Sequence, residues 1–214
     1  MLHISKQTHT VQTYLPVLLN LSAAALSAVG TAISFAKYGV RMFLFYTVDS
    51  NIFAMLACTV YALFLCRRIR TGKALPTGVI MTKYAAVCCL SVTFLVVIAV
   101  LAPMYGLQGY RIMLFTDDML YHHLLCPLLA FFSFFCFDRV PLAAAKAARF
   151  AMLPTAIYAV ILVALNFLKL VEGPYPFLRI YRQPAAVSVL WLVVILGGSY
   201  GIAWLAARLR QPAD

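Results

Sequence analysis

Six long apolar runs constrain the fold of this chain more than any other feature of its sequence. Each is about 20 residues long, the length that an α-helix rising 1.5 Å per residue needs to cross the roughly 30 Å hydrocarbon core of a bilayer. Because backbone groups in lipid must bond within their own segment, each run is expected to be helical. The runs are Tyr14–Phe35, Met42–Cys66, Thr82–Leu101, Met119–Phe137, Ala151–Leu170 and Ala185–Ala206. The sequence therefore predicts an all-α, polytopic integral membrane protein with six transmembrane helices.

The composition argues against both a soluble domain and a nucleic-acid-binding protein. Of 214 residues, 64% are hydrophobic and 11% are charged, whereas soluble domains carry about 25% charged residues. The net charge of +11 could suggest a nucleic acid partner. However, its densest cluster, Arg67 to Lys73, lies between two apolar runs, where cytoplasmic loops collect positive charge. The expected partner is therefore the membrane bilayer, and no nucleic acid partner is expected.

The distribution of basic residues predicts the orientation of the chain. With the N-terminus inside, eleven Lys and Arg residues, Lys83 among them, fall on the cytoplasmic side and six on the opposite side. Because cytoplasmic loops are enriched in Lys and Arg, both termini are expected to be cytoplasmic. No loop is long enough for a second domain and no repeat is visible, so residues 1–214 are expected to form a single six-helix transmembrane domain.

The six cysteines all lie within or beside apolar runs and show no metal-type spacing to histidine or to one another. Buried thiols of this kind usually act as small hydrophobic side chains. We expect no disulfide, no metal and no organic cofactor.

Polar side chains within the runs gather near one side of the membrane, opposite the termini. Thr47 lies about six residues, or roughly 9 Å, inside the outer end of the second run, and His122 and His123 lie at a similar depth on the fourth. Thr47, Ser50 and Asn51 are three and four residues apart, so they share one helical face. The sequence predicts a polar pocket near the outer leaflet.

The side chains of this pocket suit nucleophilic attack. A threonine hydroxyl is a weak nucleophile unless a base takes its proton, and histidine is suited to that role. A carboxylate such as Asp118 would orient the imidazole, and an amide or backbone N–H would hold the oxyanion. Pro127, four residues after His123, frees a backbone carbonyl near residue 123. The same residues also admit a structural interpretation, because Ser, Thr and Asn commonly pack one membrane helix against another.

Three short motifs in this order resemble the androgen-induced-gene and ADTRP-like family of small membrane proteins, including its bacterial branch. They are Tyr46-Thr47-Val48-Asp49-Ser50-Asn51, His123-Leu124-Leu125-Cys126-Pro127 and Tyr175-Pro176-Phe177-Leu178. The resemblance implies an intramembrane threonine hydrolase that cleaves fatty acid esters of hydroxy fatty acids, with Thr47 as the nucleophile. The bacterial pattern favours His123 as the base, whereas the animal pattern favours His122.

We also expect further site residues and a location. Ser50, Asn51, Asp118 and Asn166 are candidate supporting groups, and the substrate pocket is expected to include Tyr46, Tyr121, Tyr175 and Phe177. The expected location is a bacterial inner (cytoplasmic) membrane, and the expected partner is a lipid or fatty-acyl ester substrate. Asp117 or Asp118 stands where animal members often have asparagine, and an acidic residue expected after Pro127 is absent. A small transporter or channel component, or a non-catalytic membrane accessory protein, is the alternative.

Overall fold

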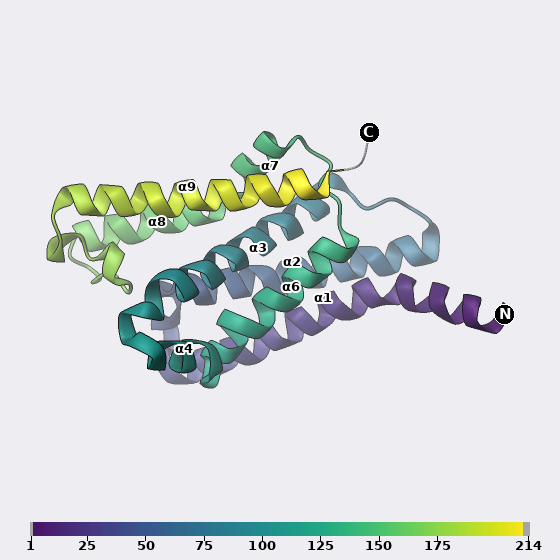
Figure 1. The fold of residues 1–214 in the computed structure, drawn as a ribbon, viewed down its shortest axis with the longest axis horizontal. Coiled ribbons are helices and arrows are strands. Elements are labelled where there is room, and N and C mark those ends of the chain that lie inside the picture. Colours follow the sequence, from purple (N-terminus) through teal and green to yellow (C-terminus); the bar gives the residue numbers. More distant parts are fainter. Residues whose placement is uncertain (1, 212–214) are drawn as a thin grey trace.

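The computed structural model describes residues 2–211, and the side chains of residues 13–211. The described part is 86% helical and contains no strand, and six of its segments are long and apolar enough to cross a membrane (Figure 1). The prediction of an all-α integral membrane protein with six transmembrane helices is confirmed.

Kinks divide several of these spanning segments into shorter helices. The helices are α1 (Leu2–Tyr38), α2 (Tyr46–Thr71), α3 (Thr77–Val96), α4 (Gly106–Phe115), α5 (Asp117–Met119), α6 (Cys126–Phe137), α7 (Ala144–Ala151), α8 (Leu153–Phe167) and α9 (Ala185–Arg210). Two π-helical turns, Val97–Leu101 and Leu120–Leu125, continue α3 and precede α6.

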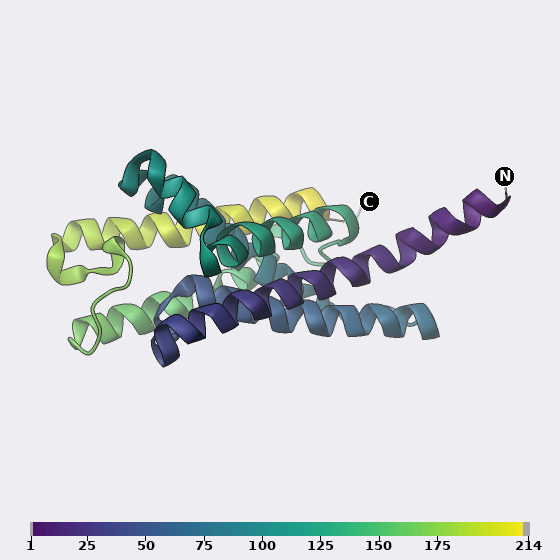
Figure 2. The same ribbon diagram turned by 90° about the horizontal axis from the view of Figure 1, so that it is seen from below.

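The helices form an elongated bundle whose two ends differ. Helices α1 and α2 lie side by side, α3 packs against α2, α6 and α9, and α8 runs beside α9 (Figures 1 and 2). The start of α1 and the end of α9 lie at the same end of the bundle, as an even number of spans requires. At the opposite end lie α4 and the loop of residues 168–184, called here the α8–α9 loop.

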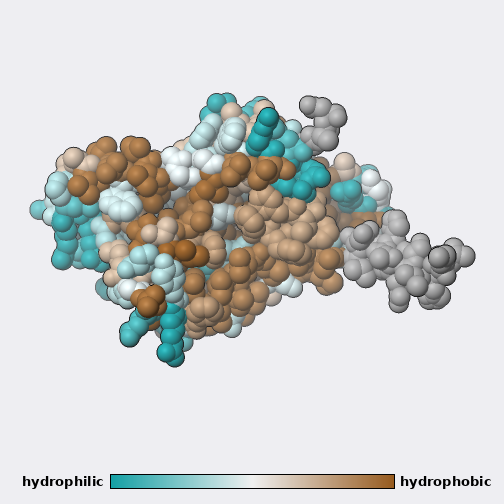
Figure 3. Space-filling view, in the orientation of Figure 1, coloured by the Kyte–Doolittle hydropathy of each residue, from teal (hydrophilic) through white to brown (hydrophobic). Residues whose placement is uncertain are grey.

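Apolar side chains cover much of the surface between the two ends (Figure 3). On α9, for example, Val189, Leu190 and Val193 are each about 60% exposed. In water such a surface would be unfavourable, whereas in lipid it needs no covering, because lipid tails are as apolar as these side chains. Hydrophilic side chains gather mainly toward the ends, where headgroups and water would meet the protein.

The count of cytoplasmic charges assumed that Lys83 lies on the surface, but the structure places it inside the bundle. Its side chain is 1% exposed, and its Nζ atom lies 2.6 Å from Oδ2 of Asp138 and 2.9 Å from Oγ of Ser133. Tyr61 donates a hydrogen bond of 2.7 Å to the other carboxylate oxygen. Because an unpaired charge is costly inside a membrane protein, this pairing explains the burial. Without Lys83 the count is ten against six, which favours the same orientation.

The helix α4 was not predicted, because the third apolar run was expected to end at Leu101. The chain turns at Pro103 and then folds back as α4. Gly109 makes this possible, since a Cβ atom at that position would overlap the backbone carbonyl of Ala102. The turn brings Met113 back toward the membrane-spanning part of the bundle, where it contacts the candidate site.

Candidate functional site

Thr47 lies in the first turn of α2, because the helix begins at Tyr46 and the preceding Phe45 is extended. The backbone N–H groups of Val48 and Asp49 both donate to the carbonyl of Phe45. The first N–H groups of an α-helix have no partner within the helix. The N–H of Thr47 is therefore free to bond outside α2, and it does so at 3.3 Å to the hydroxyl of Tyr175.

His123 lies in the π-helical turn that precedes α6. In this turn the N–H of Cys126 donates to the carbonyl of Tyr121, five residues back, and not to that of His122. The carbonyl of His122 accepts instead from Nδ2 of Asn51, at 3.2 Å. The sequence placed a freed carbonyl near residue 123, and the π turn places one at the adjacent residue. Asn51, which also donates to the carbonyl of Thr47 at 2.8 Å, thus ties the turn to α2.

The side chains of Thr47 and His123 meet inside the protein. Oγ1 of Thr47 lies 3.2 Å from Nε2 of His123, and the two residues are 8% and 3% exposed. The other ring nitrogen, Nδ1, lies 2.7 Å from the carbonyl oxygen of Met113. Because a carbonyl only accepts, Nδ1 carries a proton, and in the neutral ring Nε2 then presents its lone pair to the threonine hydroxyl. The arrangement is that of a hydroxyl beside an oriented general base.

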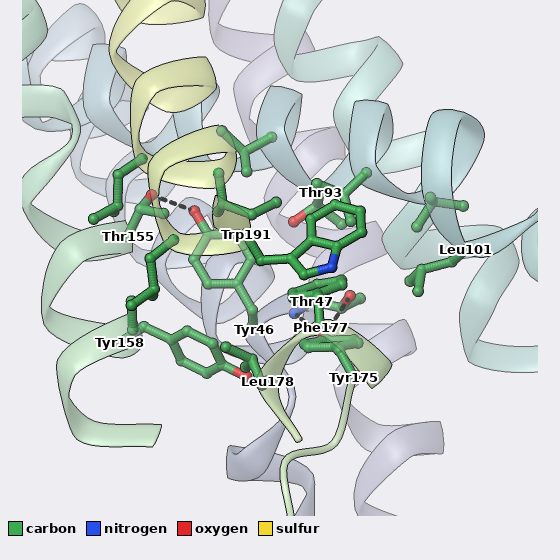
Figure 4. A pocket seen from close by; sticks show the side chains of 17 residues that line it. Tyr46, Thr47, Thr93, Leu101, Thr155, Tyr158, Tyr175, Phe177, Leu178 and Trp191 are labelled. Carbon is green, nitrogen blue, oxygen red and sulfur yellow. Dashed lines mark hydrogen bonds between the residues drawn. The ribbon is translucent and has the colours of Figure 1, made fainter. Parts of the chain in front are cut away.

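Tyr175, from the α8–α9 loop, completes the surroundings of Thr47 (Figure 4). Its hydroxyl lies 3.3 Å from Oγ1 of Thr47. The ring of Tyr175 stacks on that of Phe177 at 5.3 Å between centroids and meets the edge of Phe45 at 6.4 Å. Burial raises the pKa of Tyr175, which keeps the phenol protonated and able to donate a hydrogen bond.

The ring of His122 belongs to a different network and does not contact Thr47. Its Nε2 atom lies 3.2 Å from Oγ of Ser34, and Ser34 donates to Oδ2 of Asp118 at 2.8 Å. The other oxygen of Asp118 accepts from Lys37 at 2.7 Å. Asp118 therefore orients His122 through a serine, and the group that orients His123 is a backbone carbonyl.

The remaining predicted residues divide between the site and its supports. Ser50 donates to the carbonyl of Thr47 at 3.0 Å and contacts Thr93 at 2.9 Å, so it fixes the first turn of α2. Asn166 lies away from Thr47: it bonds the carbonyl of Val171 and the N–H of Ile180, at 2.9 and 3.1 Å. It holds the two sides of the α8–α9 loop together.

The predicted aromatic residues also divide into two groups. Tyr46, Tyr175 and Phe177 line a cavity beside Thr47, and the hydroxyl of Tyr46 lies 2.7 Å from Oγ1 of Thr155 (Figure 4). Tyr121 packs against α1, where a Cβ atom on Gly30 would lie 2.8 Å from its own Cβ. Tyr121 lines neither of the cavities that reach Thr47.

Two cavities of different character reach Thr47. A narrow cavity of about 50 Å³ has almost wholly apolar walls from α3, α8, α9 and the α8–α9 loop. A wider cavity of about 380 Å³ has more polar walls, which include Asp118, His123 and Arg179. Thr47, Leu101 and Tyr175 line both. The hydroxyl of Thr47 therefore lies at the junction of an apolar and a polar chamber.

Two backbone groups at the site could not be identified from the sequence, for the same reason. The carbonyl of Met113 and the N–H of Thr47 belong to the backbone, and any residue type would supply them. The one available signal was Gly109, whose small size lets α4 fold back. Lys37 and Ser34, which hold Asp118, come from α1 and were not expected at the site.

Comparison of the chain with protein-family models, curated proteins and solved structures finds no match. Within residues 2–211 no group of three or more His, Cys, Asp or Glu side chains is placed to hold a metal ion.

Proposed function

We propose that the protein is an intramembrane hydrolase of lipid esters, with Thr47 as nucleophile and His123 as general base. The observation that carries the proposal is the contact of 3.2 Å between Oγ1 of Thr47 and Nε2 of His123, with Nδ1 of the same ring held by a carbonyl. A nucleophile, a base and a group that orients the base are the parts of a catalytic triad. The family resemblance of the three motifs suggests the same reaction.

The reaction would proceed in two steps. Oγ1 of Thr47 bonds to the ester carbonyl carbon as its proton passes to Nε2 of His123, and the carbonyl π electrons move onto oxygen. The C–O bond to the alcohol then breaks, and the proton on Nε2 goes to the leaving oxygen. Water attacks the acyl-threonine in the same way, with His123 again taking and returning the proton, and releases the fatty acid.

The two cavities suit an ester with one apolar and one more polar half. The narrow cavity would take the first carbons of the acyl chain, beside the scissile bond, and the side chains of Trp191 and Ile195 on α9 line its wall. The wider cavity would take the alcohol half, near Arg179 and Asp118. A fatty acid ester of a hydroxy fatty acid is a substrate of this kind. The positive charge in the loops supports an orientation with both termini cytoplasmic and the site near the outer leaflet. The location that we propose is a bacterial inner membrane.

A transporter or channel is less well supported than a hydrolase. A pathway needs polar groups across the full depth of the membrane. On α2, Asn51 belongs to the polar cluster around Thr47, and Tyr61 belongs to the cluster around Asp138. The two residues lie ten positions apart, about 15 Å along the helix. Between them, Ala54, Ala57 and Cys58 are buried and apolar. The face of α2 between the two clusters is therefore apolar.

The proposal is tested with the full chain in detergent or liposomes, a fluorophosphonate reagent and a long-chain ester of a hydroxy fatty acid. Thr47→Ala is expected to abolish both labelling and turnover, whereas Thr47→Ser keeps the hydroxyl and retains turnover. Thr59→Ala is the matched control, because Thr59 lies on the same helix and its hydroxyl donates to the carbonyl of Met55 on that helix, at 2.7 Å. Labelling that persists undiminished in Thr47→Ala would exclude Thr47 as the nucleophile.

A further inference from the structure

Two hydrogen-bond donors converge beside the oxygen that would attack the ester. The hydroxyl of Tyr175 lies 3.3 Å from Oγ1 of Thr47 and 3.3 Å from the backbone nitrogen of the same residue. Because the N–H can only donate, the phenol oxygen accepts from it and keeps its own proton free. Oγ1 of Thr47 directs its proton to Nε2 of His123, so the proton of Tyr175 points toward Oγ1.

At rest the two donors are engaged within the site itself, because the N–H of Thr47 donates to the phenol oxygen of Tyr175 and the phenol donates to Oγ1 of Thr47, both at a long 3.3 Å. The N–H of Thr47 belongs to the first turn of α2, whose positive end favours negative charge. The phenol of Tyr175 lies at the wall shared by both cavities, at the point where a scissile bond spanning them would lie. Donors that are already fixed where negative charge develops stabilise a transition state without reorganising.

Several contacts within the α8–α9 loop hold the hydroxyl of Tyr175 in place. Asn166 ties Val171 to Ile180 across the α8–α9 loop, and Arg179 donates to the carbonyl of Gly173 at 3.1 Å. Phe177 lies between Tyr175 and Trp191, with centroid distances of 5.3 and 5.5 Å. A loop whose role was only to cover a cavity would not require its tyrosine hydroxyl to contact the first turn of α2.

We infer that the hydroxyl of Tyr175 and the backbone N–H of Thr47 form the oxyanion hole of the proposed reaction, which makes Tyr175 a catalytic residue. The inference rests on the proposed hydrolase function. As Thr47 attacks, the carbonyl oxygen gains the π electron pair and enters the space between the two donors. Both then donate to the oxyanion, and neither transfers its proton. When the tetrahedral intermediate collapses, the electron pair returns to the carbon and the donors reform their resting hydrogen bond.

The test compares three Tyr→Phe variants of the full chain with the same ester. Tyr175→Phe is expected to lower kcat about 100- to 1000-fold with little change in KM, the usual cost of losing one oxyanion donor. Tyr181→Phe and Tyr84→Phe are matched controls, because their hydroxyls donate to the carbonyls of Phe167 and Ala203, at 2.7 and 2.6 Å, and neither tyrosine lines a cavity that reaches Thr47. Both controls are expected to keep a near-normal kcat.

A second measurement separates catalysis from packing. A trifluoromethyl ketone that forms a tetrahedral adduct is expected to bind Tyr175→Phe more weakly by the same factor as kcat falls, while inhibition by the product fatty acid is unchanged. If Tyr175→Phe does not fold, the role of the phenol is tested instead by placing 3,5-difluorotyrosine at position 175. This phenol loses its proton at lower pH, so the alkaline limb of the kcat profile moves to lower pH.

The outcomes distinguish this inference from the proposed function. An unchanged kcat in Tyr175→Phe, with Thr47→Ala inactive, overturns the oxyanion hole and leaves the hydrolase intact. An equal loss in all three Tyr→Phe variants, or an unmoved pH profile with difluorotyrosine, also overturns it. Activity that persists in Thr47→Ala excludes Thr47 as the nucleophile, and a wild-type chain that turns over no ester overturns the hydrolase itself.

Discussion

The carbonyl oxygen of Met113 lies 2.7 Å from Nδ1 of His123, and this contact fixes which nitrogen of the ring faces Thr47. In a Ser-His-Asp triad a carboxylate has this place. A neutral carbonyl orients the imidazole equally well but stabilises its protonated form less. Met113 lies on α4, a short helix that reaches the site only because the chain reverses at Pro103.

The two adjacent histidines are expected to respond differently to substitution. His123→Ala removes the base and is expected to lower kcat by at least about 100-fold. His122→Ala is expected to lower the thermal stability of the protein more than its kcat, since its ring contacts Ser34 and not Thr47. Steady-state turnover and thermal unfolding in the same detergent measure both effects. Full activity in His123→Ala, with loss in His122→Ala, would reverse the assignment.

Gly109 is expected to matter through Met113. In Gly109→Ala the new methyl group would overlap the carbonyl of Ala102, so α4 must shift. Because a small misplacement of a catalytic group is costly, we expect kcat to fall about 10- to 100-fold. Gly197→Ala is the control, because nothing lies within 4 Å of a Cβ atom there. Equal kcat in the two variants would show that the position of α4 does not matter.

Asn166 is expected to act on the α8–α9 loop alone. Asn166→Ala leaves the carbonyl of Val171 and the N–H of Ile180 without their side-chain partner. Loss of such bonds costs about 1–3 kcal/mol each where the groups stay buried. We expect faster proteolysis within the loop and a lower kcat. Ser91→Ala serves as control, since Ser91 donates to the carbonyl of Val87 on its own helix. A loop equally resistant in both variants would contradict this role.

The buried pair of Lys83 and Asp138 is expected to show strong coupling. Removing one partner, as in Lys83→Met, leaves an uncompensated buried charge and is expected to cost about 3–5 kcal/mol of stability. The double variant Lys83→Met with Asp138→Leu leaves no such charge and is expected to recover most of that loss. A double-mutant cycle with unfolding in detergent measures the coupling. Additive losses of stability in the two single variants and the double variant would mean that Lys83 and Asp138 do not stabilise each other.

The sequence predicts the six spans well because length and apolar character alone decide whether a segment can cross lipid. It also predicts that Thr47 and the two histidines lie at one depth, since depth follows from residue count along a helix. It does not decide between His122 and His123. That choice depends on how the turn at Leu120–Leu125 is oriented against its neighbours, which places the ring of His123 against Thr47 and that of His122 against Ser34. The support from Met113 was not predictable either, because a backbone carbonyl leaves no mark in the sequence.

The burial of Lys83 has a consequence for how the chain assembles during synthesis. Lys83 lies near the start of α3, and its partner Asp138 follows the end of α6, so the ribosome adds 54 residues between the two. Until then the ammonium group lacks its partner Asp138, and its long stem can extend to the nearby interface and keep it hydrated. We expect nascent chains that stop before residue 138 to leave Lys83 open to water-soluble amine reagents, and complete chains to shield it. Maturation of this end of the bundle is therefore a late event in translation.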